Sequence, residues 1–471
     1  MFIICALTQS LLPQRVCMSS ARYSSMHKFL PFSRVERLKP TEISNLEMAF
    51  DLDSDPKKVN LAGEVYHNSD GKLFVHNAVR KAEIGVACDD SYTHEPYPPL
   101  GNPDFIRAAN ELVLNKAAPA MLRNRVLGIQ TRSSVDALCL AAQFLRQKMN
   151  CNVCMLARPS SGLWEHIFKS SGFTCHSYQY YSEDRGELNI YGLVADLMTA
   201  PEGAVVVLDA CAHNPTGLDP SVDEWKLIAH IIRCKKLLPL FHLESHGLVT
   251  GDTVQDSWAV RYFVDSGFDL LCAQSFVKNF GLYNETLGHL MVVLNNSIQL
   301  DVVRGQFEAM MLQNKEKSFS AFASRIVAKI LNNASLRRDW ILSLQDVHHR
   351  LQQMRLALSN KLTVLRTPGK WSHIKNQAGP CIYTNLKPNQ LRKLRSKHVY
   401  VPDNGLINLG ALCTTNVDLV ASAIHDVMLK TESNTDKAHV LSAPRIGLQR
   451  CSPANINKIM EYRDNILLHS N

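Results

Sequence analysis

The run Val205-Val206-Val207-Leu208 is short, aliphatic and mostly β-branched, which predicts a strand that is buried on both faces. Residues 237–241 and 270–276 have the same character. Residues 223–232, between the first two runs, carry apolar side chains on one face of a predicted helix. Buried strands separated by helices are typical of a parallel sheet with helices on both sides. The sequence therefore predicts an α/β fold with a mainly parallel sheet covered by helices.

The composition is that of a globular protein. The chain has 471 residues, of which 46% are hydrophobic and 20% charged, and this length is sufficient for two or three domains. No apolar run approaches the roughly 20 residues that a membrane-spanning helix needs. The formal charge of +8 is spread along the chain rather than gathered in one segment. We expect neither a membrane nor a nucleic acid as partner.

Changes in composition and in the expected secondary structure along the chain predict five segments. Residues 74–334 form a large α/β domain and residues 335–432 a smaller α+β domain, to which an N-terminal arm at 29–73 also contributes. Residues 433–471 form a divergent tail. Residues 1–28 contain arginines and serines but no acidic residue, since the first is Glu36. We expect an unstructured extension there, and a mitochondrial transit peptide is the alternative.

Thirteen cysteines in a chain without a secretory signal predict reduced and mostly buried thiols. Cys151 and Cys154 have C-x-x-C spacing, but no second such pair exists to complete a zinc site. The pair also lies in an apolar, strand-like run. We therefore expect core cysteines and no metal site.

Two motifs carry the chemistry: Ala212-His213-Asn214-Pro215-Thr216-Gly217 and Ser275-Phe276-Val277-Lys278-Asn279-Phe280-Gly281-Leu282-Tyr283-Asn284. Each lies at or just after the end of a predicted parallel strand. Ligands of open α/β sheets bind beyond the carboxyl ends of the strands. Asn214, His242 and Lys278 are therefore expected to converge on one site, where a lysine amine is a candidate nucleophile.

These motifs, together with segments 55–61, 258–264 and 367–371, resemble the class I pyridoxal-phosphate-dependent aminotransferases, and the cytosolic aspartate aminotransferases most of all. The resemblance extends over residues 29–431. It implies a fold-type I transferase with a large domain and a smaller α+β domain. It also implies a cytoplasmic homodimer with sites at the subunit boundary, and a reaction that converts L-aspartate and 2-oxoglutarate to oxaloacetate and L-glutamate.

The resemblance also implies roles for single residues. Lys278 would hold pyridoxal 5'-phosphate and shuttle the substrate's α-proton. Asn214 would hydrogen-bond the ring hydroxyl of the cofactor, although Asn-Pro also commonly opens turns. Ser275 and Ser133 would contact the phosphate, and each could equally be a local turn or capping serine.

The sequence departs from the family pattern around the cofactor. His242 stands where the family places an aspartate opposite the pyridine nitrogen, and an imidazole stabilises a protonated ring less well than a carboxylate. Ser245 replaces a tyrosine and Thr286 a phosphate-binding arginine. Ser134 and Val135 stand where the phosphate loop has glycine and threonine.

The substrate-binding positions depart further. Leu406 aligns with the arginine that binds the α-carboxylate, and Gln313 lies near the arginine that reaches across the dimer. Ser161 replaces the aromatic residue that stacks on the ring, and nearby Trp164 is a candidate substitute. We therefore expect a pyridoxal-phosphate-dependent aminotransferase with impaired aspartate–glutamate exchange. The alternatives are a non-catalytic binding or regulatory dimer, and altered chemistry such as amino-acid racemisation.

Overall fold

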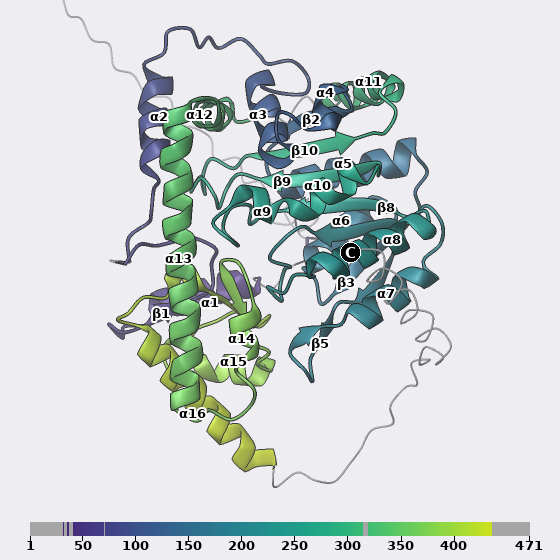
Figure 1. Cartoon of the computed structure of the whole chain (residues 1–471). Coiled ribbons are helices and arrows are strands. Elements are labelled where there is room, and N and C mark those ends of the chain that lie inside the picture. Colours follow the sequence, from purple (N-terminus) through teal and green to yellow (C-terminus); the bar gives the residue numbers. More distant parts are fainter. Residues whose placement is uncertain (1–31, 33–34, 37–40, 70, 314–318, 436–471) are drawn as a thin grey trace, which may run out of the picture. The chain divides into compact units, whose positions relative to one another are not determined.

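The computed structural model describes residues 32, 35–36, 41–69, 71–313 and 319–435 (Figure 1). The chain divides into two units, residues 1–41 and 42–471, and the fold below is that of the second. Only Phe32, Val35, Glu36 and Thr41 of the first unit are described. The predicted extension at 1–28 and most of the predicted tail, from residue 436 on, lie outside the described residues.

A seven-stranded sheet forms the centre of the large part of this unit (Figure 1). Its order is β2 (Val126–Thr131), β10 (Gly288–Val293), β9 (Leu270–Ser275), β8 (Leu238–Leu243), β7 (Val205–Asp209), β3 (Val153–Arg158) and β4 (Thr174–Gln179). Strand β10 pairs antiparallel with both of its neighbours, whereas the remaining pairs are parallel. The three predicted strands are β7, β8 and β9, so the prediction of a mainly parallel sheet is confirmed.

Helices cover both faces of the sheet because successive strand side chains point to opposite sides. On one face Val205, Leu240 and Leu271 pack with α5 (Ser134–Lys148), α6 (Gly162–Ser170) and α11 (Ile298–Gln313). On the other face Val206 and Phe241 pack with a second group of helices. This second group is α3 (Pro103–Leu114), α7 (Ile190–Thr199), α8 (Val222–Cys234) and α10 (Trp258–Asp265).

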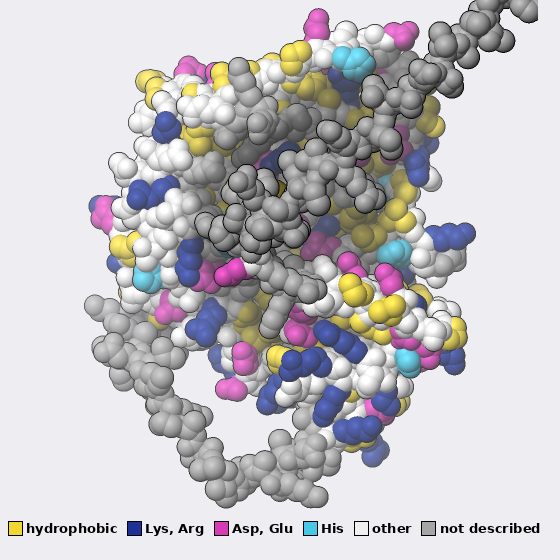
Figure 2. Space-filling model, turned by 180° about the vertical axis from the view of Figure 1, so that it is seen from behind, with side chains coloured by type: hydrophobic (Ala, Val, Ile, Leu, Met, Phe, Trp, Pro, Cys, Tyr) yellow, Lys and Arg dark blue, Asp and Glu magenta, His cyan; other side chains and the backbone are white. Residues whose placement is uncertain are grey.

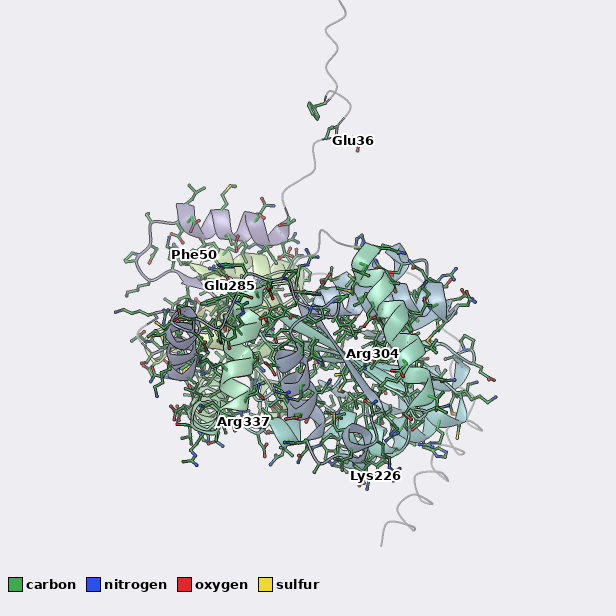
Figure 3. All side chains as sticks on the ribbon, turned by 90° about the horizontal axis from the view of Figure 1, so that it is seen from above. Glu36, Phe50, Lys226, Glu285, Arg304 and Arg337 are labelled. Atoms are coloured by element: carbon green, nitrogen blue, oxygen red, sulfur yellow. The ribbon has the colours of Figure 1, made fainter. Side chains whose placement is uncertain are left out.

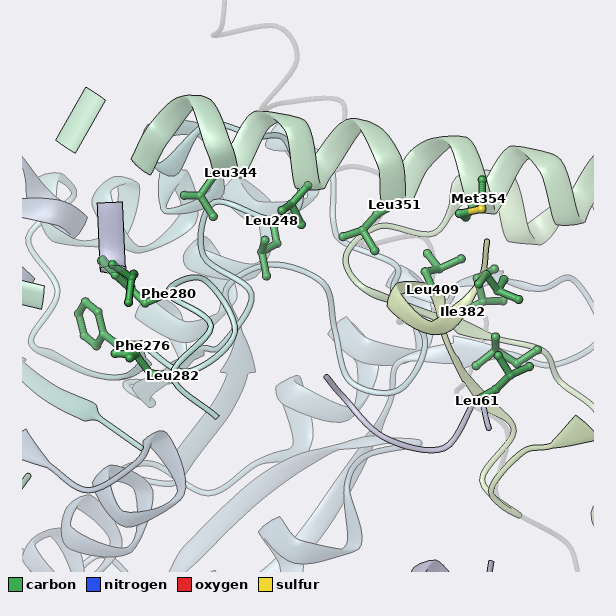
Figure 4. Packing of buried hydrophobic residues seen from close by; sticks show 14 of the residues in the cluster. Leu61, Leu248, Phe276, Phe280, Leu282, Leu344, Leu351, Met354, Ile382 and Leu409 are labelled. Carbon is green, nitrogen blue, oxygen red and sulfur yellow. The ribbon is translucent and has the colours of Figure 1, made fainter. Parts of the chain in front are cut away.

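The 31-residue helix α13 (Ala334–Val364) joins the sheet to the smaller elements. Its buried side, with Leu344, Leu351 and Met354, packs near Leu248 at one end and near Leu409 at the other (Figure 4). It also contacts α2 (Asn77–Ala87), α12 (Ala321–Asn332), α14 (His373–Asn376), η3 (Leu409–Ala411) and α16 (Val417–Thr435). The domain boundary predicted between residues 334 and 335 falls at the start of this helix and stays a prediction.

The smaller elements form two short sheets. Strand β1 (Val59–Asn60) pairs parallel with β12 (Val399–Tyr400), and β11 (Cys381–Tyr383) pairs antiparallel with β13 (Leu406–Asn408). Helices α1 (Glu42–Leu52) and α15 (Pro388–Arg395) belong to this region. The short elements α4 (Pro119–Leu122), β5 (Tyr181–Ser182), β6 (Glu187–Leu188) and α9 (Thr253–Asp256) complete the described chain.

Charged side chains lie at the outside of these layers. Lys226 on α8 and Arg304 on α11 mark two such positions in Figure 3, and acidic side chains lie among basic ones over the visible face in Figure 2. None of the described helices is both long and apolar enough to cross a bilayer.

The cysteines of the described residues are all free thiols. Cys154 is buried in β3, and its Sγ lies 3.1 Å from Sγ of Cys175 on the neighbouring strand β4. No three His, Cys, Asp or Glu side chains within the described ranges are placed to hold a metal ion.

Candidate active site

Lys278 lies three residues beyond the end of β9, in a loop at the carboxyl edge of the sheet, and only 9% of it is exposed. Asn214 follows β7 at the same edge. The two residues line one cavity of about 30 Å³, together with Glu244, Ser245 and Leu406. The predicted convergence of Asn214 and Lys278 is therefore confirmed. His242 lies inside β8 and does not belong to the lining of this cavity.

Two carboxylates hold the Lys278 amine. Its Nζ lies 3.1 Å from Oε2 of Glu64 and 3.3 Å from Oε1 of Glu244. Burial alone would lower the pKa of Lys278, but the charges of Glu244 and Glu64 outweigh burial, and the pKa is raised well above its usual value. The amine is therefore held as an ammonium ion, whereas attack on an aldehyde needs the neutral amine.

Neither glutamate was predicted as a site residue. Glu64 reaches the site from the loop after β1, far from Lys278 in the sequence. Glu244 comes directly after β8, where a polar residue at a strand end was a signal that could have been used.

His242 pairs with an aspartate on the neighbouring strand. The register of β7 and β8 places Asp209 opposite His242, and Oδ1 of Asp209 lies 2.9 Å from Nδ1 of His242. The other ring nitrogen lies 3.2 Å from Oγ of Ser134. Burial lowers the pKa of His242, but the hydrogen bond and charge of Asp209 outweigh burial, so the pKa is raised. Both ring nitrogens thus have partners within the protein.

Trp164 packs against this histidine. The two rings meet edge to face with centroids 4.8 Å apart, and the tryptophan is 5% exposed. Its Nε1 has no hydrogen-bond acceptor among the described residues. Ser161, three residues earlier, caps the N-terminus of α6 through the Leu163 N–H. The geometry places Trp164 beside His242, and a stacking role on the cofactor stays a prediction.

The predicted phosphate serines both make local contacts. Ser133 caps α5 by accepting a hydrogen bond from the Asp136 N–H at 3.1 Å, and Ser275 accepts one from the Val277 N–H at 3.3 Å. Asp136 also forms an ion pair with Arg132 at 3.2 Å. A helix N-terminus favours an anion, and here the carboxylate of Asp136 already lies in the first turn of α5.

The remaining predicted positions are exposed or apolar. Thr286 is exposed in the loop before β10, and Gln313 is the exposed last residue of α11. Leu406, the first residue of β13, lines the same cavity as Lys278 and both glutamates. The position where the resemblance implies a carboxylate-binding arginine is thus apolar, and Glu64 and Glu244 line the same cavity.

A family model described as aminotransferase class I and II matches residues 56–424. The chain belongs to this family. It is 37% identical to the cytoplasmic aspartate aminotransferase of Caenorhabditis elegans over 405 residues, which is 86% of this chain and 99% of that relative. The predicted family and enzyme class are therefore confirmed.

Solved structures of this family have the same fold as this chain. An aromatic-amino-acid aminotransferase from Burkholderia pseudomallei, covalently bound to pyridoxal phosphate, matches with a TM-score of 0.81 and 30% identity, over 84% of this chain and 99% of that one. The cytoplasmic aspartate aminotransferase of Saccharomyces cerevisiae matches with a TM-score of 0.80 and 31% identity, over 85% and 98%. The predicted fold type is confirmed, as is pyridoxal phosphate as the cofactor of the family.

The residues present fit this cofactor only in part. Lys278 supplies an amine for the aldehyde, and Asn214 lines the same cavity with an amide suited to the ring hydroxyl. Ser133, which is expected to contact the phosphate, caps α5 with the carboxylate of Asp136 in the first turn, and both nitrogens of His242 are already paired. A cavity of about 30 Å³ holds only two or three waters, at ~10–15 Å³ each. Cofactor binding therefore requires the ion pairs of Lys278 to open.

Proposed function

We propose that this family member binds pyridoxal phosphate covalently at Lys278, and that it does not exchange amino groups between aspartate and 2-oxoglutarate at the rate of an ordinary aspartate aminotransferase. The observation that supports the second part is the lining of the Lys278 cavity. Leu406 stands where the family binds a carboxylate, and Glu64 and Glu244 are its charged neighbours.

The bound cofactor would supply an electron-withdrawing ring next to the substrate's α-carbon. Lys278 would hold the cofactor and, once freed, would carry the α-proton. Before it can react, Lys278 must release a proton to water and leave Glu64 and Glu244. Asn214 would orient the ring through the hydroxyl. His242 would face the ring nitrogen only after its bond to Ser134 opens.

The loss of the carboxylate-binding arginine has a predictable size. Truncating one partner of a buried, hydrogen-bonded charge pair costs about 2 to 5 kcal/mol, which corresponds to roughly 30-fold to several thousand-fold in binding. Like charges from two glutamates would add to that loss. Aspartate exchange is therefore expected to be slow even when the cofactor is bound.

We also propose a homodimer in the cytoplasm. Exposed apolar side chains of α11, namely Ile298, Val302 and Leu312, support a protein–protein contact on that helix. Gln313 at the end of the same helix would then face the site of the partner subunit. The relative in Caenorhabditis elegans named as cytoplasmic supports the location, and import into mitochondria is the alternative.

A second candidate is a non-catalytic binding or regulatory protein that keeps the family fold. The pairing of Lys278 with two carboxylates favours it, because a lysine held in this way contributes to the structure without any cofactor.

Borohydride trapping separates the two candidates. The full chain is incubated with saturating pyridoxal phosphate, reduced with borohydride, digested and mapped by mass spectrometry, with Lys278→Ala as the control. The proposal expects a pyridoxyl adduct on Lys278, and an unmodified Lys278 would refute it. Oxaloacetate release from aspartate and 2-oxoglutarate is then measured on a second sample, which is incubated with pyridoxal phosphate in the same way but is not treated with borohydride. A rate equal to that of an ordinary aspartate aminotransferase would refute the second part.

A further inference from the structure

Glu64 and Glu244 bring two carboxylate oxygens to one nitrogen atom from separate parts of the fold. Their oxygens lie 3.1 and 3.3 Å from Nζ of Lys278, within the range of direct ion pairs. Glu64 lies in the loop after β1, and Glu244 follows β8. An ammonium group has three donors and no acceptor, so two converging carboxylates suit it well.

We propose that Glu64 and Glu244 form an ammonium-binding clamp, and that the site selects small primary amines that lack a carboxylate on the reacting carbon. This inference rests on the proposed function in one respect, namely that the cofactor occupies Lys278. With the cofactor attached, Nζ of Lys278 keeps at most one N–H in place of the three of an ammonium, so the two carboxylates lose most of their donors. Buried or half-buried carboxylates without a partner are unfavourable, and a ligand ammonium restores the pairing.

The two glutamates differ in exposure. The side chain of Glu244 is 24% exposed, whereas that of Glu64 is 56% exposed. Solvent screens the more exposed charge more strongly, so Glu244 contributes more of the attraction. Glu244 is the specificity-determining residue, and Glu64 completes the clamp from the solvent side.

Apart from Lys278, the lining offers a carboxylate no cation. Leu406, Pro215, Ala378 and Pro380 carry no donor for an anion, and Asn214 and Ser245 carry neutral donors only. A ligand carboxylate would also lie near two negative charges, which is repulsive.

The space around Lys278 limits the size of the ligand. The cavity shared with Asn214 measures about 30 Å³, and a second one on another side of the lysine measures about 20 Å³. Aromatic and aliphatic residues contribute to the second lining, among them Tyr66, Phe74, Leu248 and Leu351. A short alkyl chain therefore suits the remainder of the amine better than a polar group.

Deleting the lysine side chain tests the clamp without any cofactor. Lys278→Ala removes Cγ, Cδ, Cε and Nζ, which together match propylammonium in size and charge. The full-length variant is titrated with propylammonium, propionate and aspartate, and thermal stability and binding heat are measured. Tetramethylammonium, a cation without N–H donors, controls for ionic strength.

Propylammonium is expected to bind Lys278→Ala and raise its melting temperature, while leaving the wild type unchanged. Lys278→Ala combined with Glu244→Gln is expected to bind propylammonium at least ten-fold more weakly than Lys278→Ala alone. Lys278→Ala combined with Glu64→Gln is expected to lose less affinity for propylammonium. Equal effects of propylammonium and tetramethylammonium, or tighter binding of propionate or aspartate, would overturn the clamp.

If Lys278→Ala does not fold alone, refolding yield gives the same comparison. Propylammonium is then expected to raise the yield and propionate is not, and equal yields overturn the clamp. Because no cofactor is present, the outcome is independent of borohydride trapping. A failure of trapping would refute the proposed function but would not change the propylammonium result. A failure of propylammonium to bind would refute the clamp but would not change the trapping result.

Discussion

Replacing Glu244 by glutamine should free Lys278 for reaction with pyridoxal phosphate. Glu244 and Lys278 lie 3.3 Å apart. Coulomb's law gives about 5 kcal/mol for this distance at an effective dielectric constant of ~20, and about 1.3 kcal/mol at the value of water, ~80. Because the carboxylate is partly exposed, the true value lies between these limits. One pKa unit corresponds to about 1.36 kcal/mol, so Glu244→Gln should lower the pKa of Lys278 by about 1 to 4 units.

The assay is the pH dependence of adduct formation at Lys278. Wild type and variant are exposed to pyridoxal phosphate for a fixed time at a series of pH values up to about 9, reduced with borohydride and quantified by mass spectrometry. Below the pKa of Lys278 the fraction of neutral amine rises ten-fold per pH unit. The variant should therefore reach a given yield at a pH at least one unit lower than the wild type.

Other titratable groups near Lys278 do not confuse this measurement. Burial raises the pKa of Cys381 to about 11 and also raises that of Tyr283, so both are neutral throughout the range used. Glu64→Gln is the matched control, since this side chain is more exposed and its removal should shift the profile less. If the profile of a folded Glu244→Gln variant overlaid that of the wild type, the argument that this ion pair holds Lys278 protonated would be refuted.

Three further predictions concern neighbouring features. Leu406→Arg combined with Glu64→Gln supplies a cation for a dicarboxylate, and calorimetry should show that it binds succinate at least ten-fold more tightly than the wild type, which corresponds to about 1.4 kcal/mol. Leu406→Gln is the control, and equal affinities of the double variant and the wild type would contradict the placement of Leu406. Asp209→Asn removes the group that raises the pKa of His242, so the NMR titration midpoint of this histidine should fall below 6.5, and an unchanged midpoint would contradict the pairing. Burial lowers the pKa of His289 to about 3, so the folded state resists its protonation and stability is lost as pH falls below 6.5. His289→Phe should flatten the loss of denaturant stability between pH 6 and 4, and an equally steep loss would show that other groups cause it.

The fold could be predicted because its signals are local. The runs at β7, β8 and β9 are β-branched or aliphatic, and the intervening helix α8 has a clear apolar face together with a Ser221–Glu224 capping box. The position of Asn214 and Lys278 beyond strand ends follows from the same pattern, because parallel strands end at one edge.

The partners of the site residues could not be predicted because they depend on register and long-range packing. Asp209 faces His242 only because β7 and β8 pair in one particular register, and a shift of one residue would turn the side chains to opposite faces. Glu64 reaches Lys278 from a loop that lies 214 residues earlier in the chain (278 minus 64). Trp164 was expected near the cofactor ring, and only the packing of α6 shows that it also lies against His242.

The ion pairs and hydrogen bonds of Lys278 and His242 indicate how the departures from the family pattern act together. If Leu406 and His242 had simply replaced the arginine and the aspartate that the resemblance implies at these positions, Lys278 would have fewer partners and His242 would have an unpaired ring nitrogen in the core. Instead the lysine has two carboxylates, and the histidine has Asp209 and Ser134. Buried charges without partners destabilise a fold by several kcal/mol, so a site that has only lost residues should be locally weak. A site in which each buried charge has a partner of opposite sign or a hydrogen bond retains its stability and has a different charge preference. That difference is the reason to test amines at this site before amino acids.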